Sequence, residues 1–323
     1  MIRALVTGGS GFVGVNVTRA LLRAGHEVHL FLRQAHQTWR LTDIAGDVHV
    51  HEVDLQDRDR VRQTVRETKP DWVFHLAAYG AYSSQTGIHQ MISTNLTGCV
   101  HLLDACVETG VQAFVQTGSS SEYGYKGHPA RECEAIQPNS HYAITKAAST
   151  HYCQFTARTS GIHAVTVRLY SIYGPYEEPT RFIPTLIVHG LERRLPPLVS
   201  PGIARDFVYV DDAVDALLLI ARSSAAIAPG AIFNICRGYQ TTIGEVVEEL
   251  RRLVGVLEEP AWSTMPDRQW DTNTWVGDPS VIVRTLGWRP LVDVHSGLHR
   301  TLRWFEHNPM MLQAYRKCIF GAG

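Results

Sequence analysis

Residues 7–14 read Thr7-Gly8-Gly9-Ser10-Gly11-Phe12-Val13-Gly14, and this glycine-rich stretch decides the fold. The apolar run Ile2 to Val6 precedes it, and Val13, Val17 and Leu21 follow at helical spacing, so the pattern predicts a strand, a tight turn and a helix. Glycines three residues apart suit close approach of a pyrophosphate to the backbone and close packing of helix on strand. Free N–H groups at the helix start would face the phosphates. The stretch therefore predicts a dinucleotide site rather than a flexible Gly-rich loop.

Length and composition indicate an enzyme-like chain with one large domain and a smaller partner. The chain has 323 residues, of which 45% are hydrophobic, and its 30 basic residues balance 31 acidic ones. No block of like charge predicts binding to nucleic acid or to a membrane surface. The first predicted strand begins at Ile2, and no apolar run approaches the ~20 residues of a membrane helix. We therefore expect a cytoplasmic protein.

Cysteine and histidine spacing gives no sign of a metal centre. The six cysteines form no C-x-x-C pair, which favours reduced, mostly buried thiols. The 16 histidines are scattered singly, so we expect packed or surface roles for them and no metal site. This expectation includes four histidines in strand-like surroundings: His29, His49, His51 and His75.

Strand-like and helical stretches alternate along the first half of the chain. The predicted strands are 2–6, 27–32, 48–53, 72–77, 113–116 and 163–169. Regular alternation of this kind predicts parallel βαβ units, and hence a doubly wound α/β sheet of the Rossmann type with ligands at the carboxyl ends of its strands. Asp54 follows the third strand, where it either faces the adenine side of a dinucleotide or caps the helix at 58–68.

The end of the second predicted strand bears on which nicotinamide cofactor is used. Sites for NAD usually carry a carboxylate there to bind the ribose 2′-hydroxyl, whereas a nearby Arg accommodates the 2′-phosphate of NADP. This chain reads Leu30-Phe31-Leu32-Arg33, without an acid. Arg33 therefore favours NADP(H), and NAD(H) remains the alternative.

A Ser, a Tyr and a Lys supply the predicted chemistry. Ser119 follows the fifth strand, and Tyr142 and Lys146 lie four residues apart at the start of a later helix, which places them on one helix face. An ammonium near a phenol stabilises the phenolate and lowers its pKa from about 10. Tyr142 could then exchange a proton with a carbinol or carbonyl, to whose oxygen Ser119 adds a hydrogen bond.

Together these motifs resemble the extended short-chain dehydrogenase/reductases of the nucleotide-sugar epimerase/dehydratase group. The resemblance also rests on four later stretches: 168–175 (RLYSIYGP), 204–212 (ARDFVYVDD), 233–235 (FNI) and 286–290 (LGWRP). It implies a dinucleotide-binding domain of residues 1–170 plus 207–236, and a nucleotide-sugar domain of residues 171–206 plus 237–323. It also implies a nucleotide diphosphate sugar as substrate and a homodimer formed by the helices that carry Asn95 and Tyr142.

The expected contacts follow from these motifs and from the resemblance. We expect the cofactor to contact Gly8, Ser10, Gly11, Phe12, Val13, Gly14, Arg33, Asp54, Leu55, Leu76, Ala77, Ala78, Asn95, Tyr142 and Lys146. We expect the substrate to contact Tyr79, Ser83, Ser120, Ser121, Ser171, Val199, Arg205, Arg268 and Asp271. Arginines can hold a diphosphate bidentately. Thr242 and Glu245 have the form of a capping box and receive a structural role only.

Departures from the family pattern narrow the reaction. Relatives that dehydrate or decarboxylate carry an acid two residues after the catalytic Ser or Thr, where this chain has Ser121. Elimination needs an acid and a base at adjacent carbons, and Glu122 is offset by one residue, which in a strand-like segment points it to the opposite face. Ser171 also replaces the usual Asn.

These departures leave a ranked set of functions. They argue against a 4,6-dehydratase or decarboxylase and favour an NADP(H)-dependent 4-ketoreductase that acts on a 4-keto-(6-deoxy) nucleotide sugar. An NAD-dependent 4-epimerase is the alternative. A non-catalytic nucleotide sensor would be expected to have lost Tyr142 or Lys146, and the chain retains both.

Overall fold

The computed structural model describes residues 1–34, 38–265 and 272–321. Its larger part is a parallel sheet of seven strands in the order β10-β6-β5-β4-β1-β2-β3. The strands are β1 (Arg3–Thr7), β2 (Glu27–Leu32), β3 (His49–Glu52), β4 (Trp72–His75), β5 (Ala113–Ser119), β6 (Ala164–Leu169) and β10 (Ile232–Ile235). All six neighbouring pairs are parallel. The predicted doubly wound sheet is confirmed, and β10 adds a seventh strand at one edge.

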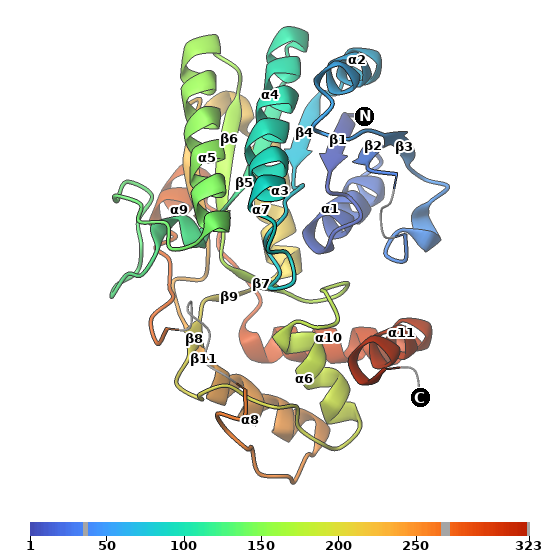
Figure 1. Ribbon diagram of the computed structural model, residues 1–323, viewed down its shortest axis with the longest axis vertical. Coiled ribbons are helices and arrows are strands. Elements are labelled where there is room, and N and C mark those ends of the chain that lie inside the picture. Colours follow the sequence, from blue (N-terminus) through green and yellow to red (C-terminus); the bar gives the residue numbers. More distant parts are fainter. Residues whose placement is uncertain (35–37, 266–271, 322–323) are drawn as a thin grey trace.

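Helices cover both faces of this sheet (Figure 1). On one face lie α1 (Phe12–Arg23), α7 (Val210–Arg222) and α9 (Ser280–Leu286), which share a core with Val6 and Leu30. On the other face lie α2 (Arg58–Thr68), α4 (Gly98–Thr109) and α5 (His141–Ser160), packed on Leu5 and Phe114. Successive residues of β1 point alternately into the two cores, so β1 is buried on both faces. A strand buried on both faces needs apolar residues at every position, which explains the continuous apolar run in the sequence.

A second apolar core lies below the sheet (Figure 1). It is built by α6 (Phe182–Leu191), α8 (Ile243–Val254), α10 (Val294–His307) and α11 (Pro309–Phe320). Two short sheets border it, one of β7 (Ser171–Tyr173) with β9 (Phe207–Tyr209) and one of β8 (Ala204–Arg205) with β11 (Thr241–Thr242). Phe207 and Tyr209 pack in this second core, although the sequence-based division places residues 207–236 in the larger domain.

The predicted capping box is present at the start of α8. The Thr242 hydroxyl accepts a hydrogen bond from the Glu245 backbone N–H at 3.1 Å, and the Thr242 N–H donates to the Glu245 carboxylate at 2.7 Å. Asp57, and not Asp54, caps α2, because its carboxylate accepts from the Arg60 N–H at 3.0 Å. Asp54 instead accepts from the Gln56 N–H. The capping alternative for Asp54 is therefore wrong.

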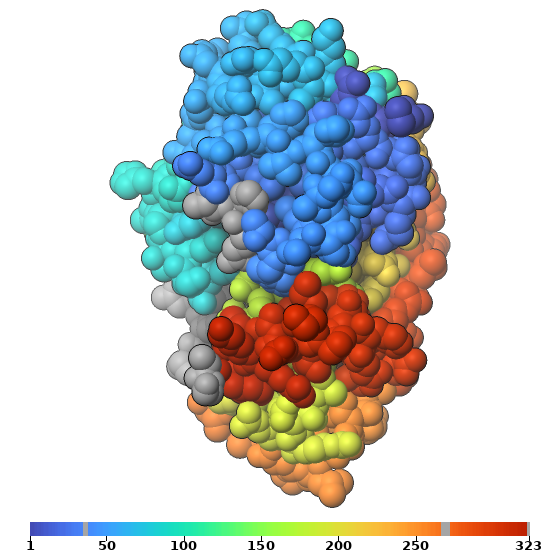
Figure 2. Space-filling view, turned by 90° about the vertical axis from the view of Figure 1, so that its right-hand side faces the viewer, coloured from blue at the N-terminus to red at the C-terminus, as the bar shows by residue number. Residues whose placement is uncertain are grey.

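Arg40 ties the amino-terminal third of the chain to the second core. Its buried guanidinium donates to the Tyr176 carbonyl at 2.7 Å and to the Glu178 carboxylate at 3.0 Å. The neighbouring Trp39 ring meets Tyr315 of α11 edge to face, with centroids 5.7 Å apart. Figure 2 shows α11 lying directly under the amino-terminal residues on this side of the molecule. Within the described residues, no helix is both long enough and apolar enough to span a membrane.

Candidate active site

The glycine turn between β1 and α1 has the geometry expected of a dinucleotide cradle. Gly8 has φ of +69°, and a Cβ added there would lie 2.7 Å from the Ala77 nitrogen. A Cβ on Gly14 would lie 2.1 Å from the Gly8 carbonyl oxygen. Side chains are therefore excluded at both positions, and α1 begins at Phe12 behind a Gly11 N-cap that offers no capping side chain. The first N–H groups of α1 are thus available to a phosphate, which fits a bound dinucleotide.

The loop after β4 lies beside this cradle, because β4 is the neighbour of β1. The Thr7 hydroxyl hydrogen-bonds His75 Nδ1 at 2.7 Å and accepts from the Ala77 N–H at 3.3 Å. Leu76, Ala77 and Ala78 are half-buried next to the turn. The structure thus brings the predicted cofactor residues Leu76 and Ala77 up to Gly8.

Asn95 holds the same loop against α5. It lies in a π-helical turn, η2 (Ile92–Thr97), between α3 (Ile88–Met91) and α4. Its amide oxygen accepts from the Tyr79 N–H at 2.8 Å, and its NH₂ group donates to the Tyr79 carbonyl at 2.8 Å and to the Thr145 hydroxyl at 2.9 Å. Both amide hydrogens are therefore occupied by protein. The observed role of Asn95 is positioning, and a π-turn is a frequent feature of functional sites.

Ser119, Tyr142 and Lys146 converge where β5 ends and α5 begins. Ser140 caps α5 by accepting from the Ala143 N–H at 3.2 Å, which fixes the first turn that carries Tyr142. The Ser119 side chain lies close enough to the Tyr142 hydroxyl to lower its pKa. Lys146 lies one turn further along the helix and is only 3% exposed. Tyr142 is half-buried, so neither side chain of this pair is fully exposed to solvent.

The pKa of Tyr142 differs from the sequence-based expectation. Burial raises it to about 12, and the Ser119 hydroxyl offsets only part of this rise. Arg181 also lowers the Tyr142 pKa, while Glu122 raises it. Burial likewise lowers the pKa of Lys146, since a charged ammonium loses hydration there. Our expectation that Lys146 makes Tyr142 acidic is therefore wrong for the protein by itself, because desolvation of the phenolate outweighs the favourable contacts.

Glu122 is sealed inside the protein. One carboxylate oxygen accepts from the Ser119 N–H at 2.8 Å and from the Thr150 hydroxyl at 3.1 Å, and the other accepts from Arg168 Nε at 2.9 Å. Glu122 itself has no exposed surface. The segment after Ser119 is a 3₁₀ turn, η3 (Ser120–Tyr123), and not a strand, so the strand alternation assumed for Glu122 does not apply. Glu122 instead forms a capping box with Ser119. Its role is to fix the β5 end that carries Ser119.

The two serines after Ser119 have different surroundings. The Ser120 hydroxyl accepts from the Trp275 indole N–H at 3.2 Å, and Ser120 is buried. The Ser121 hydroxyl lies 2.7 Å from that of Ser119 and is half-buried. Ser121 therefore forms a hydrogen-bonded pair with Ser119, whereas the Ser120 hydroxyl is turned toward Trp275.

The remaining predicted substrate residues are partly gathered near this centre. The Arg205 guanidinium lies 5.9 Å from the Trp275 ring centroid, so Trp275 links Arg205 to Ser120. Ser171 begins β7 next to Asp206, whose carbonyl accepts from its N–H at 3.0 Å. Val199 packs on the second core, and Ser83 is exposed. Arg268 and Asp271 lie outside the described residues, so their predicted roles stay predictions.

Two predicted cofactor residues flank the edge of the sheet. Arg33 is exposed directly after β2, where a 2′-phosphate would be met. Leu55 is buried, and its Cβ lies so close to Gly98 of α4 that a Cβ added to Gly98 would be only 2.8 Å away from it. The Leu55 side chain is therefore a packing group for α4.

A family model for the NAD dependent epimerase/dehydratase family matches residues 4–236, a span that includes the glycine turn and the Ser119, Tyr142 and Lys146 cluster. The chain belongs to this family. The match covers most of the described sheet.

Relatives within the family include dehydratases and epimerases. A probable dTDP-glucose 4,6-dehydratase of Sinorhizobium fredii is 28% identical, over 99% of this chain and 97% of the relative. The UDP-glucose 4-epimerase of Thermus thermophilus, solved in complex with NAD, is 29% identical with a TM-score of 0.83, and the match covers 95% of this chain and all of the other. A dTDP-glucose 4,6-dehydratase of Streptomyces venezuelae, solved with NAD and TYD, is 27% identical with a TM-score of 0.85, over 97% of this chain and all of the other.

Sequence reasoning missed several side chains of this family member's site. Tyr82 and Arg181 both act on the pKa of Tyr142, which Tyr82 raises and Arg181 lowers. Arg181 Nε is 3.7 Å from Glu177, a buried acid whose pKa is raised to about 8 by desolvation. Trp275 is missed as well. These residues come from loops far apart in the sequence, and only Tyr82 lies next to a predicted substrate residue, Ser83.

Proposed function

We propose that the protein transfers a hydride at C4 of a nucleotide diphosphate sugar without eliminating water, and that it works as an NADP(H)-dependent 4-ketoreductase. The observation that carries this proposal is the contrast within one loop. Ser119 and Tyr142 are half-buried and Lys146 is buried, whereas positions 120 and 121 are serines and Glu122 is engaged by Arg168, Thr150 and the Ser119 N–H. The loop thus supplies hydride-transfer chemistry without an elimination acid.

The same contrast argues against dehydration, although several relatives are dTDP-glucose 4,6-dehydratases. Elimination of water needs a group that donates a proton to the leaving hydroxyl and a base at the adjacent carbon. A serine hydroxyl serves neither role at neutral pH, because its proton is too weakly acidic. The Ser120 oxygen is also occupied by the Trp275 N–H.

The proposed mechanism assigns each residue a task. The carbonyl oxygen of a 4-ketosugar accepts hydrogen bonds from the Ser119 and Tyr142 hydroxyls, and Tyr142 delivers its proton as the alkoxide develops. NADPH, when bound, supplies the hydride. A pKa near 12 suits a phenol that must arrive protonated, and Ser121 extends the hydrogen bonds that stabilise the phenolate left behind. Lys146 would bind the nicotinamide ribose from its buried position.

The preference for NADP rests on Arg33 and on the absence of an acid between Leu30 and Arg33. The glycine cradle fits either dinucleotide, because Gly8 and Gly14 exclude side chains from the pyrophosphate position. Titration of the purified protein with NADPH and with NADH, followed by nicotinamide fluorescence, tests the preference. We expect tighter binding of NADPH, and weakening of NADPH alone in Arg33→Ala. Tighter binding of NADH would overturn the assignment.

An NAD-dependent 4-epimerase is the second candidate. It is supported by the similarity to the Thermus thermophilus UDP-glucose 4-epimerase, whose structure contains NAD. A reductase consumes its reduced cofactor, whereas an epimerase regenerates it in each cycle. One assay separates the two, in which a panel of 4-keto and 4-hydroxy sugar nucleotides is offered and absorbance at 340 nm and product composition are both followed. Loss of NADPH with each turnover supports the reductase. Interconversion of sugar nucleotides at constant absorbance supports the epimerase.

A further inference from the structure

A cluster of histidines and one glutamate lies on β2 and β3, away from the candidate active site. Glu27 and His29 share one face of β2, because residues two apart in a strand point the same way, and His49 and His51 share the same face of the edge strand β3. The register sets His29 beside His49. β1 and β4 separate these strands from β5, which carries Ser119. The cluster is therefore a separate feature of the sheet.

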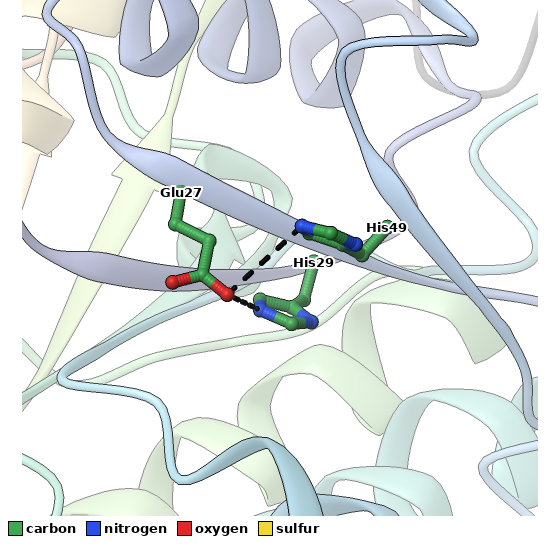
Figure 3. Close-up of side chains that lie close together, drawn as sticks. All are labelled: Glu27, His29 and His49. Carbon is green, nitrogen blue, oxygen red and sulfur yellow. Dashed lines mark hydrogen bonds and ion pairs between the residues drawn. The ribbon is translucent and has the colours of Figure 1, made fainter.

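Three ligand atoms of this cluster face one another (Figure 3). Glu27 Oε1 lies 2.9 Å from His29 Nε2 and 4.0 Å from His49 Nε2, and the three atoms all lie within 4.8 Å of one another. Ligands around a tetrahedral zinc ion are about 3.3 Å apart, given bond lengths of about 2.0–2.1 Å. That spacing is reached if the Glu27 to His29 distance increases slightly and the Glu27 to His49 distance decreases. His49 is 62% exposed, so its side chain can move and water can reach the fourth position.

Neighbouring groups hold these ligands in place. Arg3 Nε lies 3.3 Å from Glu27 Oε2, which leaves Oε1 as the oxygen that faces the histidines. His51 Nε2 lies 2.8 Å from His29 Nδ1. A metal-bound histidine usually uses its second ring nitrogen in such a hydrogen bond, which fixes the ring and its tautomer.

The proton positions can change without any change in charge. An ionised Glu27 can only accept, so His29 Nε2 carries the hydrogen and His29 Nδ1 accepts from His51 Nε2. When an ion occupies His29 Nε2, the His29 hydrogen resides on Nδ1 and is donated to His51 Nε2, while the hydrogen of His51 moves to its own Nδ1. Both rings stay neutral, and neutral imidazole is the form that binds metal.

We propose that Glu27, His29 and His49 bind one divalent transition metal ion of the zinc class, with water as the fourth ligand and His51 as the positioning residue. Two imidazoles and one carboxylate are ligands that suit Zn²⁺ and Co²⁺, and three protein ligands with an open position are a known zinc arrangement. Bound there, the ion joins the edge strand β3 to β2. This site is independent of the proposed reductase activity.

The test uses the full chain without a polyhistidine tag, freed of metal by a chelator. We expect Co²⁺ to produce a saturable visible absorption at one ion per chain, and Zn²⁺ to displace it. His49→Gln should weaken Co²⁺ binding about tenfold or more, and His51→Gln should weaken it while preserving one ion per chain. Zn²⁺ should raise the Tm of the parent protein but not that of His49→Gln.

A matched control is His128→Gln. His128 is 58% exposed and lies 3.0 Å from Glu134, but this pair supplies only two ligands. We expect unchanged Co²⁺ binding in this variant. No saturable binding to the parent protein, or equal affinities for the parent and His49→Gln, would overturn the proposal.

Discussion

At the scale of single residues, Tyr142 and Glu122 have different roles, because the first is the proposed proton donor and the second holds the loop in place. In the proposed mechanism Tyr142 delivers a proton to the carbonyl oxygen, and Ser119 donates a hydrogen bond to the same oxygen. The Tyr142 pKa of about 12 follows from burial and is lowered by the Ser119 hydroxyl. Glu122 sits only three residues beyond Ser119 in the sequence, yet its carboxylate is directed into the core. Substitutions at these two positions should therefore have different signatures.

Tyr142→Phe should lower kcat by ~10²-fold or more while cofactor binding stays intact, because only the proton donor is lost. Steady-state turnover of a 4-ketosugar nucleotide and fluorescence titration with NADPH give the two readouts. Tyr152→Phe is the matched control, since Tyr152 lies on the same helix and donates its hydroxyl to Asp104 at 2.6 Å. Near-normal turnover in Tyr142→Phe would refute the proposed role.

Glu122→Gln should chiefly destabilise the protein. The change leaves the buried Arg168 charge without its ion partner at 2.9 Å, and loss of one partner of a buried pair costs about 3–5 kcal/mol in the free energy of unfolding. Adding Arg168→Met should recover a large part of that loss. Urea unfolding measures both variants. Unchanged stability with abolished turnover would instead indicate a chemical role for Glu122.

At the scale of elements, the close approach of β1, α1 and β4 makes the cradle. Gly8 and Gly25 both have positive φ, of 69° and 74°. A Cβ on Gly8 would meet the Ala77 nitrogen at 2.7 Å, whereas a Cβ on Gly25 would meet nothing within 4 Å. A substitution at Gly25 therefore tests backbone strain alone, whereas a substitution at Gly8 tests strain together with a steric clash.

Gly25→Ala should cost only about 1–2 kcal/mol of unfolding free energy, which is the penalty of a left-handed non-glycine residue. Gly8→Ala should cost more and should also weaken cofactor binding, because Ala77 must move. Urea unfolding and NADPH titration of both variants check this. Equal behaviour of the two variants would show that the approach of Ala77 to the turn is unimportant.

At the scale of the whole molecule, two features concern stability and assembly. His75 is buried beside Thr7 at the end of β4, and desolvation lowers its pKa to about 3. Exposed apolar side chains on α5 include Ile144 and Phe155, which are 11 residues apart on one helix face, and Ile88 and Ile92 lie exposed on the adjoining α3 and η2. Each feature leads to a measurable outcome.

His75 should make the protein sensitive to mild acid. Because its pKa is about 3 when folded and about 6.5 when unfolded, its contribution is complete above pH 6.5 and is lost as pH falls toward 3. The loss is about 1.4 kcal/mol per pH unit, or about 2 kcal/mol at pH 5. Relative to its own stability at pH 7, His75→Asn should lose correspondingly less at pH 5. Parallel urea curves at both pH values measure this, and identical pH slopes would contradict it.

We expect a homodimer that buries the α5 face, since a cluster of exposed apolar side chains often marks a contact between proteins. Phe155→Asp should shift the protein toward monomer in analytical ultracentrifugation. Leu257→Asp is the control, because Leu257 is 91% exposed but lies beyond α8, away from this face. A monomeric parent protein, or an unchanged dimer in Phe155→Asp, would contradict the expected interface.

The sequence alone predicted six of the seven strands, the glycine cradle and the candidate reacting residues, because each depends on short-range patterns. Apolar runs of strand length, glycines at fixed spacing and a Tyr four residues before a Lys are local signals, and the structure confirms the elements that they predict. Strand alternation did not apply to Glu122, because the segment after Ser119 forms a 3₁₀ turn.

Only the tertiary structure decided the environment of these groups. The pKa of Tyr142 depends on burial by segments distant in sequence, which no local pattern reports. Trp275 and Arg181 reach the site from separate loops, and the parallel register of β2 and β3 gathers histidines that are scattered along the chain. Desolvation and proximity are properties of packed surfaces, so they appear only once the chain has folded.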